Sequence, residues 1–212
     1  MNFDVLLMYA IFSFFYIISP GPAIFLAISN GISANMQIVA ISSLGNIIAL
    51  FLLSAISILG LGVLLSASST LFIIAKIIGA SYLIYLGVKQ FRIATRTRAL
   101  LKREKKTSLR NKSDYFYEGF FLAATNPKPI LFFTAIFPQF LDLQSSLVPQ
   151  FFIMTITFMA LSFISLFSYG YISKSAKNLF TNHTGMAWFH RITGGLFIGM
   201  GFGLLQLKNS LS

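Results

Sequence analysis

The chain has no cysteine among its 212 residues, and it has few charged residues of either sign. The absence of cysteine excludes disulfide bonds and thiolate metal sites within the chain. Only five residues are acidic, and charged residues make up 10% of the sequence. A soluble domain of this length needs more polar surface than that to cover its core. The composition therefore favours a membrane protein over a soluble globular domain.

The scarcity of acids and histidines also limits the chemistry. The five acids stand outside the middles of the long apolar segments, so none offers itself as a buried proton carrier. The two histidines, His183 and His190, form no metal-ligand cluster with them. No nucleophile stands beside a base in a recognisable pattern. We therefore expect no metal site, no cofactor and no enzymatic activity.

Long hydrophobic runs dominate what is present, with 56% of the residues hydrophobic. A helix needs roughly 20 apolar residues to cross a bilayer, and six segments qualify. The sequence predicts an all-α integral membrane protein in which residues 1–212 form one membrane domain. The N-terminus has no basic segment before the first apolar run, so that run is interpreted as a true span. The predicted spans are approximately 4–28, 38–65, 71–91, 115–141, 147–173 and 187–207.

The net charge of +11 is concentrated in one loop. Ten basic residues and a single acid, Glu104, lie between Lys89 and Lys112. Positive loops of membrane proteins stay on the cytoplasmic side, so the loop at about 92–114 is predicted to be cytoplasmic and both termini outside. The same charges attract anionic lipid weakly. No nucleic-acid motif accompanies them, so nucleic-acid binding is not expected.

Two of the predicted spans contain a doubled proline motif. The first reads Ser19-Pro20-Gly21-Pro22 and the second reads Asn126-Pro127-Lys128-Pro129, and each has a phenylalanine three residues after its second proline. Two prolines in three residues interrupt a helix, because each removes a backbone donor and clashes with the preceding turn. Proline also favours the first position of a helix, so a new half-helix is expected to begin at Pro22 and at Pro129. The positive end of such a half-helix attracts a carboxylate.

A second pair of related segments follows the first. Residues 76–82 resemble residues 191–197, so each half of the chain contains the same elements in the same order. Because each half has three spans, the halves must face opposite ways, as in the inverted repeats of secondary transporters. The first repeat covers about 1–92 and the second about 115–212. Glycines at helical spacing in the last span predict close helix packing and leave a homodimer open: Gly195, Gly199 and Gly203.

The two motifs supply the candidate substrate-binding residues. Lys128 lies near the middle of a span, where a charge costs about 2.5–3.5 kcal/mol unless it is paired or hydrated. We therefore expect Lys128 to face a cavity and attract an anionic group. The amides of Asn126 and Asn46 could bond a substrate or a freed backbone group. The candidate site comprises Pro20, Gly21, Pro22, Phe25, Asn46, Asn126, Pro127, Lys128, Pro129 and Phe132.

These motifs resemble the LysE/RhtB family of bacterial amino-acid exporters. The matching segments are Ser19–Pro22, Gly79–Gly87, Asn126–Lys128 with Phe132, Phe133 and Pro138–Phe140, and Thr193–Gly199. The resemblance covers nearly the whole chain. It implies efflux of amino acids or close derivatives across the bacterial inner membrane, driven by the proton gradient. The neutral first linker at 34–37 departs from the family pattern, which usually has a basic residue there.

The apolar surroundings of the predicted site, including Phe25 and Phe132, favour a substrate with an uncharged side chain. The alternatives are an exporter of another small solute or of a metal cation, and a membrane scaffold with no transport activity. The scarcity of buried acids and histidines argues against a metal cation. A scaffold would leave the paired interruptions without a purpose.

Overall fold

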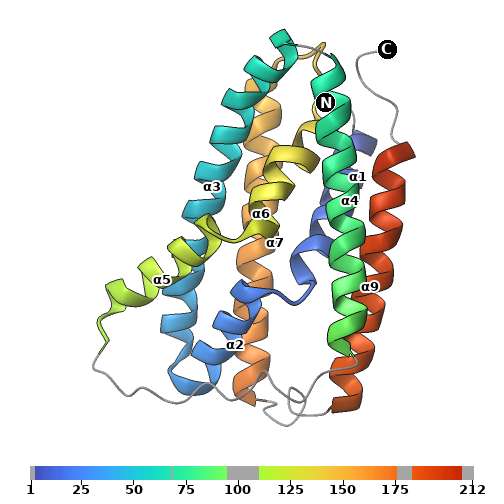
Figure 1. The fold of residues 1–212 in the computed structure, drawn as a ribbon. Coiled ribbons are helices and arrows are strands. Elements are labelled where there is room, and N and C mark those ends of the chain that lie inside the picture. Colours follow the sequence, from blue (N-terminus) through green and yellow to red (C-terminus); the bar gives the residue numbers. More distant parts are fainter. Residues whose placement is uncertain (1–2, 68, 95–109, 176–182, 207–212) are drawn as a thin grey trace.

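The computed structural model describes residues 3–67, 69–94, 110–175 and 183–206, and every regular element in those ranges is helical (Figure 1). The first half contains α1 (Phe3–Ile18), α2 (Pro22–Ser33), α3 (Met36–Ala67) and α4 (Ser69–Ala94). The second half contains α5 (Lys112–Ala124), α6 (Pro127–Leu131), the π-helix η1 (Phe132–Ile136), the 3₁₀-helix η2 (Phe137–Phe140), α7 (Leu147–Ser175) and α9 (His183–Gln206). The all-α prediction is confirmed for these residues.

Two stretches are long and apolar enough to cross a membrane as single helices, Met36–Gly60 in α3 and Leu147–Ser173 in α7. Two further stretches qualify if each bent pair of helices counts as one span, which makes as many as four among the described residues. Helices α4 and α9 are long, but their described residues do not meet the same criterion. The count of six spans therefore stays a prediction.

The bent pairs coincide with the doubled prolines. Helix α1 ends at Ile18 and α2 begins at Pro22, with a bend of 59° between them. Helix α5 ends at Ala124 and α6 begins at Pro127, with a bend of 47°. The predicted start at Pro129 is therefore wrong by two residues, because Asn126 caps the helix and Pro127 occupies its first position. Proline stands at the start of the new helix in both cases, where its missing N–H has no intrahelical role. The two bent pairs run in opposite directions along the bundle (Figure 1).

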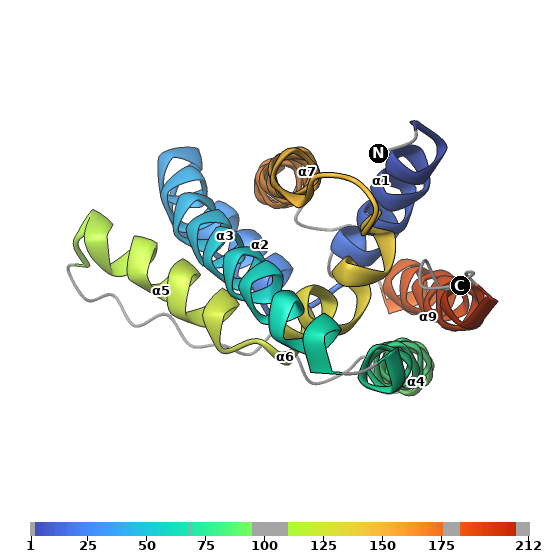
Figure 2. The same cartoon turned by 90° about the horizontal axis from the view of Figure 1, so that it is seen from above.

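Glycines bring several helices into backbone contact. A Cβ atom at Gly45 of α3 would lie 2.0 Å from the carbonyl oxygen of Phe116, and one at Gly119 of α5 would lie 2.0 Å from that of Ser42. Any larger residue at either glycine would therefore push α3 and α5 apart. Seen from above, α5 lies against α3 on the outside of the bundle (Figure 2).

The same kind of contact joins two other pairs of helices. A Cβ at Gly31 of α2 would lie 2.2 Å from the carbonyl oxygen of Gly170 on α7. Helices α4 and α9 meet where Gly87 and Gly194 face each other. In contrast, Cβ atoms at Gly195, Gly199 and Gly203 would meet nothing within 4 Å, so these three glycines of α9 face away from the rest of the described chain.

An aromatic cluster fills the bundle between α1, η1, η2 and α7. Tyr9, Phe132, Phe133 and Phe137 are fully buried in it, and the rings of Phe132 and Phe158 lie 4.5 Å apart. Two polar groups at this apolar region are paired with backbone oxygens. The Tyr9 hydroxyl donates to the Met154 carbonyl oxygen at 3.1 Å. The Ser57 hydroxyl of α3 similarly donates to the carbonyl oxygen of Phe133 in the π-helix. The irregular helix is thus held from two sides, by packing and by a side-chain bond.

The connection after η2 is fixed by one glutamine. Gln150, which is 2% exposed, accepts a bond from the Asp142 amide at 2.9 Å and donates to the Asp142 and Ser146 carbonyl oxygens. The Ser145 hydroxyl and the Gln144 amide donate to the Asp142 carboxylate, which lowers the pKa of Asp142 below its usual value. This loop therefore sets where η2 ends and α7 begins.

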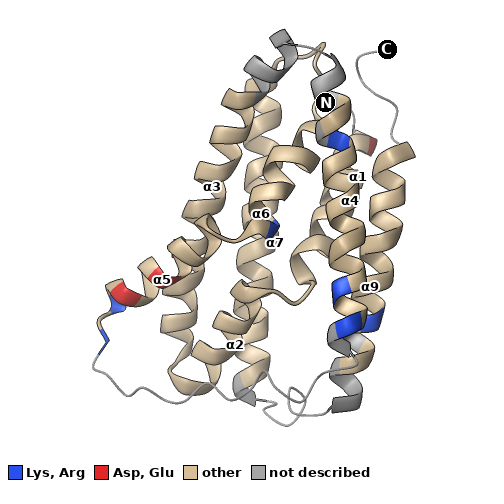
Figure 3. Cartoon of the chain, in the orientation of Figure 1, with Lys and Arg blue, Asp and Glu red and all other residues tan. Residues whose placement is uncertain are grey.

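Helix α1 begins and α9 ends at one end of the bundle, whereas α4 ends and α9 begins at the other (Figure 1). Basic residues gather on α4 and α9 near that second end (Figure 3). Most of the predicted cytoplasmic loop at 92–114 lies outside the described residues. One basic position stands apart in the interior of the bundle, on α6, whose only basic residue is Lys128 (Figure 3).

Candidate functional site

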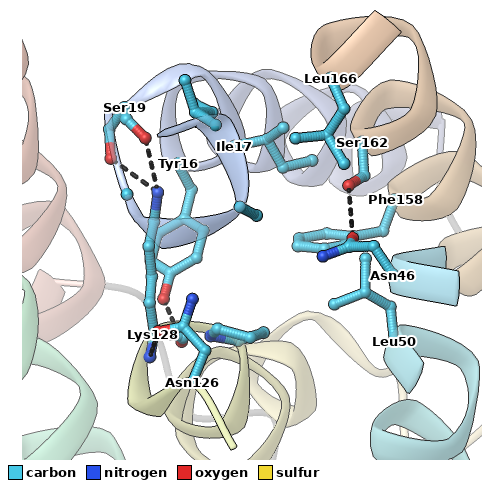
Figure 4. A pocket seen from close by; sticks show the side chains of 14 residues that line it. Tyr16, Ile17, Ser19, Asn46, Leu50, Asn126, Lys128, Phe158, Ser162 and Leu166 are labelled. Atoms are coloured by element: carbon cyan, nitrogen blue, oxygen red, sulfur yellow. Dashed lines mark hydrogen bonds between the residues drawn. The ribbon is translucent and has the colours of Figure 1, made fainter. Parts of the chain in front are cut away.

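A cavity lies where the two interrupted helices meet (Figure 4). Its lining comes from the end of α1, the start of α2, the motif around Lys128, and the facing sides of α3 and α7. Its volume is about 50 Å³, which is several times the roughly 10–15 Å³ that one water needs. The cavity therefore has room for a few waters or for part of a small polar molecule.

Lys128 forms one wall of the cavity. Its Nζ donates to the Ser19 carbonyl oxygen at 2.9 Å and to the Ser19 hydroxyl at 2.7 Å. It also lies 4.9 Å from the centre of the Tyr16 ring, a distance at which a cation is attracted to an aromatic face. Among the described residues no carboxylate lies within ion-pair distance of Lys128. An ammonium group has three donors, so one remains for a ligand.

Side chains from three other helices hold the carbonyl oxygens at the first interruption. The Tyr169 hydroxyl of α7 donates to the Ile18 oxygen at 2.9 Å, and Lys128 donates to the Ser19 oxygen. Gln90 of α4 donates through Nε2 to the Pro20 oxygen at 3.1 Å. Backbone groups released from a helix inside a membrane need such partners, because no lipid group can replace them.

Gln90 is itself held by His190 of α9. The two side chains are buried, and His190 Nδ1 lies 2.7 Å from Gln90 Oε1. Because Oε1 can only accept, Nδ1 carries the proton in this contact. The contact orients the Gln90 amide so that Nε2 faces the Pro20 carbonyl. A line of hydrogen bonds thus connects α9 to the interrupted backbone through α4.

The second interruption is held mainly by its own residues. The Asn126 side chain accepts a bond from the Lys128 amide at 3.0 Å and so caps the start of α6. The Ile130 amide donates to the Asn126 carbonyl oxygen at 3.3 Å. One bond comes from the first half of the chain, where the Tyr16 hydroxyl donates to the Lys128 carbonyl oxygen. The two interruptions are therefore joined by bonds from each side. Tyr16 of the first half donates to the Lys128 carbonyl, and Lys128 of the second half donates to Ser19.

Helix α2 presents its N-terminal end to the cavity. The cap residue Gly21 makes no side-chain bond, and the first backbone bond of the helix runs from the Phe25 amide to the Gly21 carbonyl oxygen at 3.1 Å. The amides of Ala23 and Ile24 come before that bond, and both residues line the cavity. Such amides carry the positive end of the helix dipole. They lie on the same cavity as Lys128, so both contribute positive potential to it.

The opposite wall is formed by α3 and α7. Asn46 is 5% exposed, and its Oδ1 lies 3.5 Å from the Ser162 hydroxyl. Leu50, Phe158 and Leu166 surround this pair with apolar side chains (Figure 4). The cavity thus has a cationic side at Lys128 and an uncharged polar side at Asn46.

Half of the predicted site residues line the cavity: Gly21, Asn46, Asn126, Lys128 and Pro129. The other five lie elsewhere. Pro20 is buried behind the cavity, with its carbonyl bonded to Gln90. Pro22 and Pro127 are exposed at the starts of α2 and α6, and Phe25 is partly buried on α2.

Phe132 was predicted on the site and lies in the aromatic cluster instead of on the cavity wall. It is fully buried and packs on Tyr16 at a ring distance of 4.8 Å. It therefore supports the cavity from behind, through a residue that does line it.

Sequence reasoning missed several lining residues, above all Tyr16, Ser19 and Ser162. Ser19 directly precedes the first doubled proline, so its position was a usable signal. Tyr16 lies four residues before Pro20, which has no N–H for the Tyr16 carbonyl. This spacing places Tyr16 on the last turn before the interruption. Ser162 is one of several serines on α7, and nothing in its spacing distinguishes it.

The chain is similar to a set of bacterial membrane proteins. It is 30% identical over 98% of its length to an uncharacterized membrane protein of Vibrio cholerae, all of which is covered. It is 28% identical over 87% of its length to the uncharacterized membrane protein YrhP of Bacillus subtilis, of which 90% is covered. It is also 29% identical over 71% of its length to a homoserine/homoserine lactone efflux protein of Salmonella typhi, of which 71% is covered. No solved structure matches the chain.

The family model described as LysE type translocator matches residues 14–208, a range that contains both interruptions and every residue of the cavity. The resemblance inferred from the motifs is therefore confirmed by a match over most of the chain, and this protein belongs to the LysE type translocator family.

Proposed function

We propose that this protein exports small neutral amino acids or close derivatives, such as homoserine, from the cytoplasm across the bacterial inner membrane. Membership in a translocator family and the efflux activity named for its Salmonella relatives support this proposal. The observation that carries it is the ammonium group of Lys128, which faces a cavity with one unused donor and no described carboxylate partner.

The cavity binds the carboxylate of the substrate at its cationic side. Lys128 Nζ supplies a charged donor, and the amides of Ala23 and Ile24 supply the positive end of α2. Two of the three protons of Lys128 are already bonded to Ser19, so the ammonium is held in a fixed position before the substrate arrives. Binding then requires little reorganisation of the lysine.

Transport follows an alternating-access cycle around this cavity. The chain forms six spans as two inverted repeats, and the interrupted helices of the two repeats meet at the substrate. The opposite directions of the two bent pairs and their matching sequence motifs support this arrangement. The basic loop at 92–114 lies in the cytoplasm and both termini lie outside, and the proton gradient drives export.

The proposal is tested with purified protein in liposomes, by following the efflux of labelled homoserine and of neutral amino acids. Lys128→Met keeps the length of the side chain and removes the charge. A hydrogen bond to a charged group contributes roughly 1.5–3 kcal/mol, so efflux should fall about 10–100-fold. The matched control is Lys112→Met, because Lys112 is exposed at the start of α5 and should leave efflux unchanged.

Collapsing the proton gradient with an uncoupler should abolish uphill export by the unmodified protein. If export continues against a concentration gradient after that treatment, export is not coupled to the proton gradient. Full activity of a well-folded Lys128→Met protein would show that the cavity is not the substrate site.

A further inference from the structure

The cavity wall opposite Lys128 presents an amide group with unused donors. Asn46 is 95% buried, and its only hydrogen bond within the described part of the chain is the one at Oδ1 from the Ser162 hydroxyl. That contact orients the amide so that Nδ2 points into the space facing Lys128 (Figure 4). A buried donor without an acceptor is destabilising, so this group favours a ligand oxygen.

The surroundings of Asn46 restrict what that oxygen can belong to. Leu50, Phe158 and Leu166 make this side of the cavity apolar, and Lys128 is the one charged side chain in the described lining. A charged group placed beside Asn46 would lose its hydration without gaining a counter-ion. The Asn46 amide donates, and the Ser162 hydroxyl can accept as well as donate. An uncharged hydroxyl or carbonyl oxygen fits this pair.

We propose that Asn46 and Ser162 recognise an uncharged oxygen on the substrate side chain by hydrogen bonding to it. The inference rests on the proposed function, in which the substrate carboxylate binds at Lys128. The substrate is then an α-amino acid with a hydroxyl or carbonyl group near the end of a short side chain. The small volume of the cavity, about 50 Å³, excludes long side chains unless the walls move.

The Asn46–Ser162 pair should distinguish substrates with a side-chain oxygen from those without one, because only the former satisfy the Asn46 donors. A substrate in which a methyl group replaces the hydroxyl fills the same space but leaves the Asn46 donors without an acceptor. A site built to bond a polar group rejects such an analogue more strongly than an apolar pocket rejects an added hydroxyl. We expect the unmodified protein to prefer homoserine over norvaline, its methyl isostere, by about tenfold or more in kcat/KM.

The test compares the efflux of homoserine and norvaline from liposomes containing the purified protein. Asn46→Leu replaces the amide with an apolar side chain of similar size, and Ser162→Ala removes the hydroxyl alone. Both variants should lower the homoserine-to-norvaline ratio, Asn46→Leu by about tenfold and Ser162→Ala by less. The matched control is Ser165→Ala, because the Ser165 hydroxyl is buried on the same helix but does not line the cavity.

The ratio separates a substrate contact from a structural role, because damage to folding would lower both substrates together. An unchanged ratio in Asn46→Leu and in Ser162→Ala, with both amino acids still exported, would overturn this inference and leave the proposed function intact. If the unmodified protein exports neither amino acid nor any other, the proposed function fails and the inference with it.

Discussion

The two interruptions have the same sequence pattern, yet they are held in different ways. At the first, between Ile18 and Pro22, the carbonyl oxygens depend on side chains from α4, α6 and α7. At the second, between Ala124 and Pro127, the chain turns tightly and Asn126 caps the new helix from within. The first interruption is therefore stable only while its neighbours stay in place, whereas the second is largely self-contained. The difference identifies the first as the more movable of the two.

Of the two interruptions, the larger stability effect should come from removing a neighbour of the first. Gln90→Leu leaves the Pro20 carbonyl and His190 without the bonds they make to Gln90. An unsatisfied buried group costs about 1–3 kcal/mol, so the protein should unfold at a clearly lower temperature in detergent. Gln206→Leu, at an exposed position on α9, is the control. Equal melting temperatures for the two variants would break the comparison, because the first interruption would then not depend on α4.

A smaller effect should follow from removing the cap of the second interruption. Asn126→Ala takes away the acceptor of the Lys128 amide and should cost about 1 kcal/mol. Asn126→Ser keeps a capping oxygen and should recover most of that loss. The same thermal measurement ranks both variants against Gln90→Leu. A larger loss for Asn126→Ala than for Gln90→Leu would reverse the assignment of the movable interruption.

The smallest effect is expected at Gly21, although it lies within the first motif. Its backbone has φ −149° and ψ −179°, an extended conformation that any residue adopts. An added Cβ would contact Lys128 Cδ at 3.6 Å, an ordinary packing distance. Gly21→Ala should therefore change the free energy of unfolding by about 0.5 kcal/mol or less.

The matched comparison is Gly119→Ala, whose Cβ would lie 2.0 Å from the Ser42 carbonyl oxygen. This variant should fail to give a monodisperse protein by size-exclusion chromatography. If Gly21→Ala is as damaging as Gly119→Ala, the first interruption is packed more tightly than its contacts indicate.

The sequence predicted the helical class and the family because both depend on local patterns. Long apolar segments and doubled prolines are readable residue by residue, and Lys128 was recognisable as a charge in an apolar span. The pairing of Lys128 with Ser19 and Tyr16 was not predictable, because it depends on how the two interrupted helices cross. Lys128 lies 109 residues from Ser19 and 112 residues from Tyr16 along the chain. Phe132 shows the same limit: its type and spacing are equally suitable for a cavity wall and for the aromatic cluster behind it.

Phe132 was predicted in the site and lies outside it, whereas Gln90 was not predicted and supports the first interruption. Gln90 stands at the end of the predicted span at 71–91, next to the basic loop, and nothing in the local sequence distinguishes it. Its importance arises because the Pro20 carbonyl, 70 residues away, lost its helical partner. A residue that repairs a defect elsewhere can be recognised only after the fold brings the two together.

The glycine contacts of the fold have a mechanical consequence. Backbone atoms in direct contact leave no side-chain layer that could deform, so α3 with α5, α2 with α7, and α4 with α9 should each move as one rigid body. Each body combines one element from each half of the chain. Helices α1 and α6 belong to none of the three bodies, and the interruptions at 19–21 and 125–126 join them to α2 and α5. Movement of α1 or α6 against these bodies therefore needs only a few backbone rotations beside Lys128, where the proposed ligand would bind.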